Sequence, residues 1–127
     1  MISALFNQPN YAAAKKLLDA TVLRHEAIAS NLANIETPNY KRVDVAPSFQ
    51  DELRQALAAQ STNQIDSLRP QLAPDAAAIP RTLDGNSVEL ESELAQLNQN
   101  FLAHTLETQL ITGNLSRLRL AITGRLA

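Results

Sequence analysis

Apolar residues recur at intervals of three and four positions in two long stretches of the chain, one near each end. The first stretch runs to about Glu36, and its repeating positions are Tyr11, Ala14, Leu18, Thr21, His25, Ile28, Leu32 and Ile35. The second begins near "DGNSVELESEL", and its repeating positions are Leu90, Leu94, Leu97, Phe101, His104, Thr108, Ile111, Leu115, Leu118 and Ile122. A mean spacing of 3.5 residues is typical of helices that pack along a shared seam. The pattern therefore predicts an all-α fold with two long helices in an antiparallel coiled-coil hairpin.

The segment between these stretches, residues 43–84, has a different pattern. Its part "STNQIDSLRPQLAPDAAAIP" is polar, rich in alanine and interrupted by proline, which predicts an irregular chain. The part "SFQDELRQALAAQ" predicts one short helix with Ser48 as its cap and one apolar face, formed by Phe49, Leu53, Ala56 and Leu57. We therefore divide the chain into an N-terminal helix with a turn (1–42), an irregular middle segment with one short helix (43–84) and a C-terminal helix (85–127). The two long helices are expected to form one domain.

Polar positions within the two seams predict how the helices are aligned. An antiparallel register that pairs Leu18 with Ile111 also places Thr21 beside Thr108 and His25 beside His104. A shift by one heptad would bury each polar residue against an aliphatic one, which costs free energy where no partner exists. The hairpin seam is therefore expected to consist of Leu18, His25, Ile28, Leu32, Ile35, Leu94, Leu97, Phe101, His104 and Ile111.

Five leucines fall outside the seams, on the faces that the two helices turn away from each other. They are Leu23, Leu102, Leu106, Leu110 and Leu120. Three of them, at 102, 106 and 110, follow one another at about one helical turn and form a stripe. Because a hairpin that worked alone would place charges on such a face, an apolar stripe predicts a contact with another subunit.

Composition narrows the class of protein further. The 127 residues are 45% hydrophobic but only 4% aromatic, which suits helices packed through aliphatic side chains. A formal net charge of −2 gives no general attraction for nucleic acid or anionic lipid. The chain has no cysteine, and so no disulfide framework or thiolate metal site. It has no run of about 18 apolar residues that would span a membrane. Its start, "MISALFNQPNY", is unlike a cleaved signal peptide.

The residue types that often carry chemistry lack the partners that chemistry needs. His25 and His104 belong to no HExxH-type cluster, and no carboxylate accompanies them on the seam, so we expect a polar layer that fixes the register. Ser30, Ser61 and Ser116 lack a Gly-x-Ser-x-Gly context. The sequence therefore predicts no catalytic residue, no cofactor and no metal site.

Charged residues near the two helix ends also have simple structural interpretations. Asn86 or Ser87 can cap the second helix. Three carboxylates follow these residues, Glu89, Glu91 and Glu93, and they suit the solvated start of a helix. Lys41 and Arg42 make only a minimal basic spot, which does not favour nucleic-acid binding.

The stretch "ASNLANIETPNYKR", residues 29–42, joins the end of the first helix to more amides than an ordinary helix exit needs. Pro38 suits the second position of a type II turn. Asn39 stands at the next position, which requires a positive φ. Asn34 and Thr37 can satisfy the backbone groups that become free where the helix stops.

This stretch resembles the signature of bacterial flagellar rod and hook proteins, in which Asn-x-x-Asn is followed by Thr-Pro-Gly-Tyr. The matching residues are Asn31, Ala33, Asn34, Thr37, Pro38 and Tyr40. Asn39 departs from the family, which usually has glycine there, but asparagine is the next-best residue at a positive φ and the turn is expected to be kept. The short length and the block "DGNSVELESELAQL" resemble the proximal-rod members of that family.

The resemblance implies a structural subunit of the flagellar basal body and not an enzyme. Such subunits assemble into a helical tube whose inner layer is made by the N- and C-terminal helices, and the tube transmits motor torque to the hook. They are exported by the flagellar type III apparatus without a cleaved signal peptide. They then join other rod proteins in the periplasm, near the inner-membrane ring and the adaptor at the rod base. In such a tube the middle segment would face outward and residues 34–42 would bridge neighbouring subunits.

Other interpretations of the sequence stay open at this point. One is a different rod member of the same family. Another, from a different class, is a soluble helical-hairpin adaptor or chaperone. A small metal-dependent enzyme that uses His25 and His104 is the third, although no further ligand accompanies the two histidines in the sequence.

Overall fold

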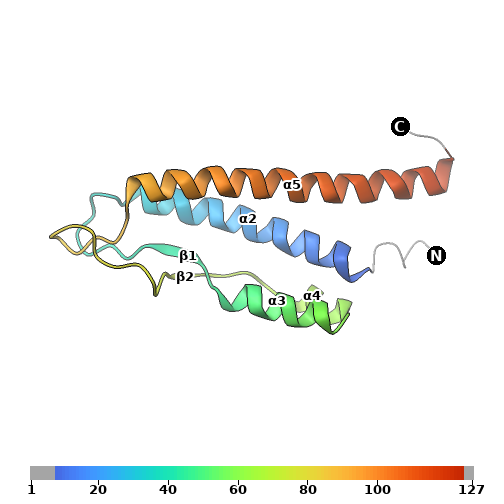
Figure 1. The fold of residues 1–127 in the computed structure, drawn as a ribbon, viewed down its shortest axis with the longest axis horizontal. Helices are drawn as coiled ribbons and strands as arrows, with labels where there is room; N and C mark the ends of the chain where they lie inside the picture. The colour runs from blue at the N-terminus through green and yellow to red at the C-terminus, as the bar shows by residue number, and fades with distance from the viewer. Residues whose placement is uncertain (1–7, 125–127) are drawn as a thin grey trace.

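The computed structural model describes residues 8–124, and within them the chain forms four α-helices and two short β-strands (Figure 1). In chain order these are α2 (Pro9–Ala33), β1 (Val43–Val45), α3 (Ser48–Ala58), α4 (Thr62–Ser67), β2 (Leu72–Pro74) and α5 (Leu90–Thr123). The prediction of two long helices near the chain ends is confirmed. The all-α class is approximate, because β1 and β2 pair as a two-stranded antiparallel sheet with Asp44 opposite Ala73.

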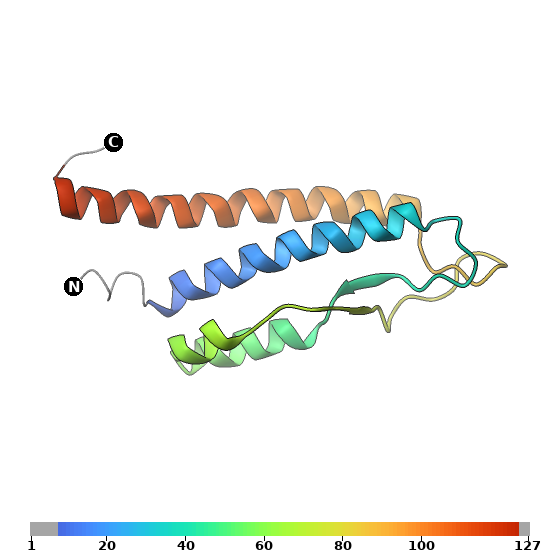
Figure 2. The same cartoon turned by 180° about the vertical axis from the view of Figure 1, so that it is seen from behind.

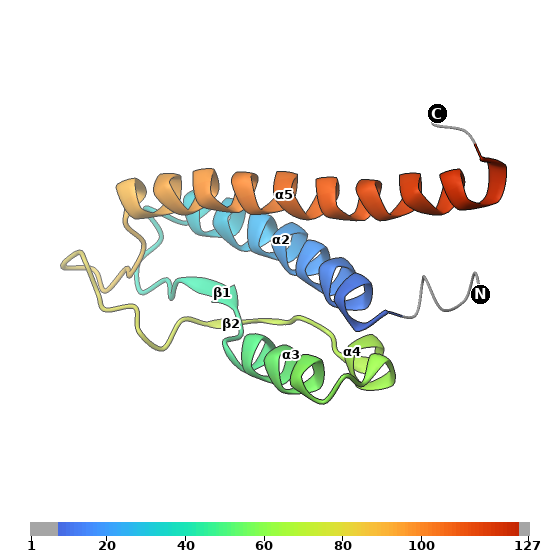
Figure 3. The same cartoon turned by 45° about the vertical axis from the view of Figure 1, so that its right-hand side comes forward.

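Helix α2 is the central element of the molecule. Helix α5 lies along one side of it, and α3, α4 and the small sheet lie along the other (Figures 1 and 2). The two long helices run antiparallel, lie close together where α2 ends and α5 begins, and diverge toward the start of α2 (Figure 3). The chain is thus a hairpin of long helices with the middle segment packed on one arm.

The ends of the long helices reflect local chemistry. Helix α2 begins at Pro9, in the first turn, where the missing N–H of proline is not needed. Helix α5 is followed by Gly124 in the left-handed region, with φ of 65°, a common helix C-terminus. Its N-cap position is Glu89, so the prediction that Asn86 or Ser87 caps this helix is wrong.

Helix α3 is the short helix that the sequence predicts. Phe49, Leu53 and Ala56 are buried on its apolar face, as expected. The N-cap position is Pro47 and not the expected Ser48, which is instead the first helical residue.

The rest of the middle segment is more regular than its proline content predicts. Helix α4 begins after Ser61, whose Oγ accepts a hydrogen bond from the Gln64 N–H at 3.3 Å. Ile65 of α4 is fully buried, and β2 pairs with β1. The irregular chain expected here is wrong for α4 and β2, because tertiary contacts with no local sequence pattern order both.

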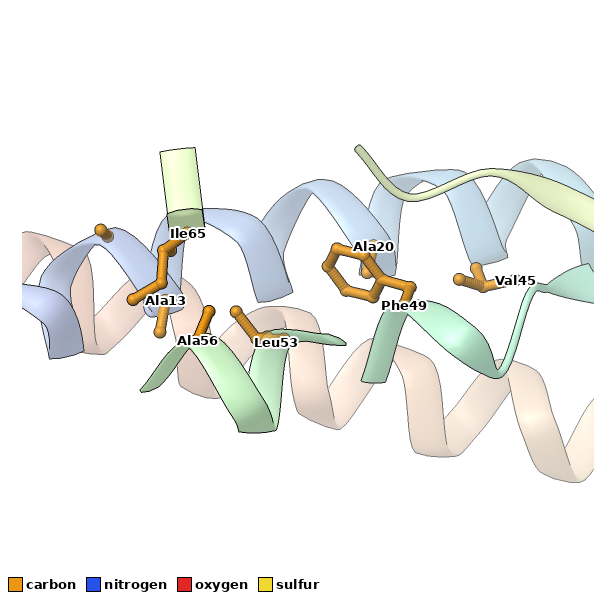
Figure 4. Close-up of a cluster of buried hydrophobic side chains, with 8 residues drawn as sticks. Ala13, Ala20, Val45, Phe49, Leu53, Ala56 and Ile65 are labelled. Carbon is orange, nitrogen blue, oxygen red and sulfur yellow. The ribbon is translucent and has the colours of Figure 1, made fainter. Parts of the chain in front are cut away.

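The hydrophobic core lies between α2 and the middle segment (Figure 4). Its buried members are Ala12, Ala13, Ala20, Val45, Phe49, Leu53, Ala56 and Ile65. Helix α2 contributes alanines, so the larger side chains of α3, α4 and β1 can approach its backbone closely. Within residues 8–124 no residue of α5 belongs to this cluster. The main apolar cluster is therefore not the seam between the two long helices that the sequence pattern suggests.

Candidate functional site: the turn network and the surface of α5

Asn31, the first residue of the predicted motif, holds the two sides of the turn together. Its side chain is fully buried, and its Nδ2 donates to the Val43 carbonyl at 2.9 Å while its Oδ1 accepts from the Val43 N–H at 3.0 Å. The same Oδ1 accepts from the Tyr40 hydroxyl at 3.3 Å. One amide side chain thus satisfies both backbone groups of Val43, as a neighbouring strand would, and fixes the chain leaving the turn against α2.

The following residues form the turn that the sequence predicts. Asn34 Oδ1 accepts from the Thr37 hydroxyl at 3.1 Å. Asn39 has a φ of 59°, in the left-handed region, and its N–H donates to the Asp84 carbonyl at 2.8 Å. Gly85 has a φ of 83°, and a Cβ at that position would lie 2.5 Å from Asn39 Oδ1. The turn thus accommodates asparagine and packs against residues 84–85 just before α5.

Asn86 has a role other than helix capping. Its side chain is fully buried, and its Nδ2 donates to three backbone carbonyls, those of Asn34 at 2.8 Å, Ile35 at 3.1 Å and Thr37 at 2.8 Å. These carbonyls belong to the C-cap residue of α2 and to the turn that follows it. Asn86 therefore ties the turn after α2 to the chain that leads into α5.

Arg42 joins three segments through one buried guanidinium, whose side chain is only 7% exposed. It donates to four acceptors, Glu93 Oε1 at 2.5 Å, Asp75 Oδ2 at 2.6 Å, Gln96 Oε1 at 2.5 Å and Asp44 Oδ2 at 3.2 Å. Burial works against the charged form, but the hydrogen bond and charge of Glu93, with the charge of Asp44, raise the pKa of Arg42 above its ordinary value. The turn, the middle segment and α5 are thereby held in one charged cluster.

Asp44 connects this cluster to the middle of α2, because its Oδ1 accepts from Arg24 Nε at 2.9 Å. Burial favours the neutral carboxyl. The hydrogen bonds from Arg24 and the Val45 N–H, with the charges of Arg24 and Arg42, nevertheless lower the pKa of Asp44 below its ordinary value. We use the name turn network for ten of these hydrogen-bonded residues, namely Asn31, Asn34, Thr37, Asn39, Tyr40, Arg42, Asp44, Asp75, Asn86 and Glu93.

The predicted hairpin seam is brought together only in part. Ile28 is buried, and five further members are half-buried, namely Leu18, Leu32, Ile35, Leu97 and Ile111. The exposed members are His25, Leu94, Phe101 and His104, with Phe101 exposed by 68%. The placement of Leu94 and Phe101 in a buried seam is therefore wrong.

The predicted register is also wrong. Thr21 was expected beside Thr108, but its Oγ1 lies 3.1 Å from His104 Nδ1, and its carbonyl accepts from Asn100 Nδ2 at 2.8 Å. The contact is displaced by one to two turns toward the start of α5. Buried polar groups require partners. Glu93 finds its partners in the turn network and Asn100 finds one in the Thr21 carbonyl, and these polar contacts favour a different alignment from the apolar match.

Helix α5 turns a polar heptad toward α2, and the sequence interpretation missed it. The residues at this spacing of seven are Glu93, Asn100, Glu107 and Asn114. The first two are buried and the last two half-buried. The expectation of a solvated Glu93 is wrong, since its side chain is fully buried. The regular interval of seven is visible in the sequence and could have predicted this polar row. The residues around Asp75 show no pattern that predicts its contact with Arg42.

The predicted interface leucines of α5 are exposed. Leu102, Leu106 and Leu110 are exposed by 67%, 58% and 51%, and we call them the leucine stripe. Leu120 is exposed by 39%. Leu23 on α2 is different, because it is half-buried and packs against the core cluster. Its assignment to a free outer face is wrong, since the middle segment covers that side of α2.

A second row of large apolar side chains on α5 is exposed, and we call it the apolar heptad line. Its members, at intervals of seven with Thr108 between the two halves, are Leu94, Phe101, Leu115 and Ile122. Their exposed fractions run from 45% to 68%. Helix α5 therefore carries two apolar rows to its surface and a polar row toward α2.

Over residues 8–124 there is no group of three or more histidine, cysteine or acidic residues that could hold a metal ion. Over the same residues no helix is both long enough and apolar enough to cross a bilayer. Internal hydrogen bonds that fix one end of a helical hairpin, together with apolar rows left on its surface, define a structural subunit that packs against others.

Comparison with known proteins identifies the kind of assembly. No family model matches the chain. The flagellar basal body rod protein FlgB of Borrelia hermsii is 30% identical over 115 residues, which cover 76% of this chain and 83% of that protein. FlgB of Aquifex aeolicus is 31% identical over 114 residues, which cover 87% and 90%. FlgB of Escherichia coli K12 is 29% identical over 117 residues, which cover 80% and 83%. The chain belongs to the FlgB family of flagellar basal body rod proteins, and this does not favour a different rod member or a soluble adaptor.

Proposed function

We propose that this protein is a subunit of the proximal rod of the bacterial flagellum, where it assembles with its neighbours into the helical shaft that carries motor torque to the hook. Membership of the FlgB family supports the assignment to the rod. The observation that carries the assembly is the exposed apolar surface of α5, formed by the leucine stripe and the apolar heptad line.

The physical argument rests on how much apolar surface the lone subunit leaves in water. Burying a leucine or phenylalanine side chain contributes about 1.5–3 kcal/mol relative to leaving it exposed. Single exposed leucines need no explanation, but two rows along one helix mark an interaction surface. A contact between different surfaces of identical subunits produces an open helical assembly when the rotation between copies does not close into a ring.

The partners in this proposal are other rod proteins, the inner-membrane ring and the adaptor at the rod base. The subunit reaches the periplasm through the flagellar type III export apparatus, without a cleaved signal peptide, and becomes part of the basal body. No catalytic step is involved, so the protein acts by packing. Three exposed residues are available to contact a neighbour, namely Ala33 at the end of α2 and Thr37 and Pro38 in the turn that follows.

A charge in the leucine stripe tests the proposal. Leu106→Asp, in a strain that lacks the chromosomal copy, is expected to be soluble and exported but absent from isolated basal bodies, so that the strain does not swim. The matched control is Leu83→Asp, which places the same change at a fully exposed leucine outside α5 and is expected to swim normally. Normal swimming of the Leu106→Asp strain, with the protein present in basal bodies, would contradict the role of this surface.

A further inference from the structure

Helices α2 and α5 enclose a groove of about 650 Å³ near the middle of the hairpin. Its walls include apolar side chains of both helices, Val22, Leu97 and Phe101, together with His25, Glu26 and His104. The groove includes Phe101, one member of the apolar heptad line.

Two buried oxygen atoms on α5 lack hydrogen-bond donors. Asn100, only 6% exposed, lines the groove and donates its Nδ2 to the Thr21 carbonyl, but among residues 8–124 its Oδ1 has no partner. Glu107, two turns further along the same face of α5, has a buried Oε2 that likewise has no donor within the described residues. Burial also raises the pKa of Glu107 above its ordinary value. A buried acceptor without a donor bears its full desolvation penalty.

The groove therefore calls for an occupant with two properties. Its walls favour apolar side chains. The unpaired Asn100 Oδ1 inside it, the carboxylate of Glu26 in its lining and the unpaired Glu107 Oε2 two turns further along α5 favour a basic donor. One exposed segment of this same chain has both, because Leu115, Arg119 and Ile122 lie at spacings of four and three on one face of α5 and are exposed.

We propose that the groove of one copy receives the end of α5 of a second copy, with Leu115 and Ile122 packed against Val22 and Phe101 and with Arg119 donating to Glu107. This contact rests on the proposed function and specifies which surfaces of two neighbouring copies meet. The groove and the end of α5 are different surfaces, so each copy keeps one of each free after pairing and the next copy can add.

Cysteine cross-linking tests the contact directly, because the chain contains no cysteine of its own. In the double variant Phe101→Cys, Ile122→Cys the two sulfurs lie on one helix and are separated by about 30 Å within a copy, since a helix rises about 1.5 Å per residue. A disulfide can thus form only between copies. Mild oxidation of basal bodies from a strain that carries this variant is expected to give a cross-linked ladder, and the control pair Leu83→Cys, Ile122→Cys is expected to give none.

The outcomes separate this contact from the function on which it rests. If the unsubstituted protein is absent from basal bodies, the proposed function is overturned and this contact with it. If the Phe101→Cys, Ile122→Cys protein is present in basal bodies but gives no ladder, the groove contact alone is overturned.

A charge exchange provides a second test that does not depend on cysteine. Glu107→Arg and Arg119→Glu are each expected to reduce the swimming zone at least tenfold in area, and the double variant is expected to recover most of it. The matched control is Arg117→Glu, an exposed residue on a different face of the same turn of α5, which is expected to swim normally. Failure of the double variant to recover, or an equal loss in the control, would overturn the pairing of Arg119 with Glu107.

Discussion

Helix α2 makes two contacts of opposite character. Toward α3, α4 and β1 it presents alanines, and large apolar side chains such as Phe49 and Ile65 pack onto them. Toward α5 it meets a polar heptad, of which Glu93 and Asn100 are buried. The first contact resembles the interior of an ordinary small domain, whereas the second is specified by hydrogen bonds.

The difference shows where each contact obtains its stability. The apolar contact depends on side chains removed from water, and the long helix α5 contributes nothing to that cluster within the described chain. The innermost row of α5 is polar, and the apolar residues of the leucine stripe and of the apolar heptad line stay on the surface. The main core thus lies on one side of α2, and the helix on the other side carries the exposed apolar rows.

The largest expected effect comes from the same substitution made on the two sides. Phe49→Ala, in the core and 3% exposed, is expected to lower the free energy of unfolding by about 3–5 kcal/mol. Phe101→Ala, on the exposed heptad line, is expected to change it by less than about 0.5 kcal/mol while weakening assembly. Urea denaturation followed by circular dichroism measures both, and equal losses would contradict the difference between the two contacts.

A smaller effect is expected where hydrogen bonds attach α5. Glu93→Gln removes the charged acceptor for Arg42 Nε, and hydrogen bonds to charged groups contribute about 1.5–3 kcal/mol each. The expected result is a loss of that size and faster hydrogen exchange at the start of α5. The control is Glu91→Gln, an exposed neighbour on another face of the helix, which is expected to change little. An unchanged exchange rate in Glu93→Gln would show that the charged cluster does not hold α5.

The sequence predicts one of the two contacts much better than the other. The apolar face of α3 and the turn around Asn39 follow from spacing and local chemistry, and both are present. Matching apolar positions predicts the alignment of α2 with α5 only if those positions are buried. In this chain Leu94 and Phe101 are exposed, so the match gives the wrong alignment. A repeat of apolar residues does not distinguish a seam within one chain from a seam between copies. The contacts of Arg42 with Asp75 and Glu93 join residues that are distant in the sequence, and no local pattern predicts them.

Acid should weaken the attachment of the turn before it affects the apolar core. The pKa of Asp44 is lowered in the folded protein, so the unfolded chain takes up the proton first as the pH falls. Its contribution to stability is therefore complete above about pH 4, near the ordinary carboxyl pKa, and is lost as the pH falls through the lower folded value. Asp44→Asn is expected to be less stable than the unsubstituted protein at pH 7 and to lose less stability between pH 4 and pH 2. Parallel curves of unfolding free energy against pH would contradict this.

The smallest expected effect is a gain in stability and concerns Glu107, a half-buried member of the polar heptad. Burial raises its pKa, so the folded state binds the proton more tightly than the unfolded chain does. Its favourable contribution is complete below the unfolded pKa of about 4.3 and is lost as the pH rises through the folded value, so the charged form opposes folding at pH 7. Glu107→Gln is therefore expected to raise the free energy of unfolding at pH 7 by less than about 1 kcal/mol, with the gain fading near pH 4. The same variant is expected to swim less well, because the neutral amide lacks the charge proposed to receive Arg119 of a second copy. A variant that is more stable as a monomer yet poorer in assembly would show that this side of α5 is adapted to its partner, whereas a loss of stability at pH 7 would show that Glu107 is paired within its own chain.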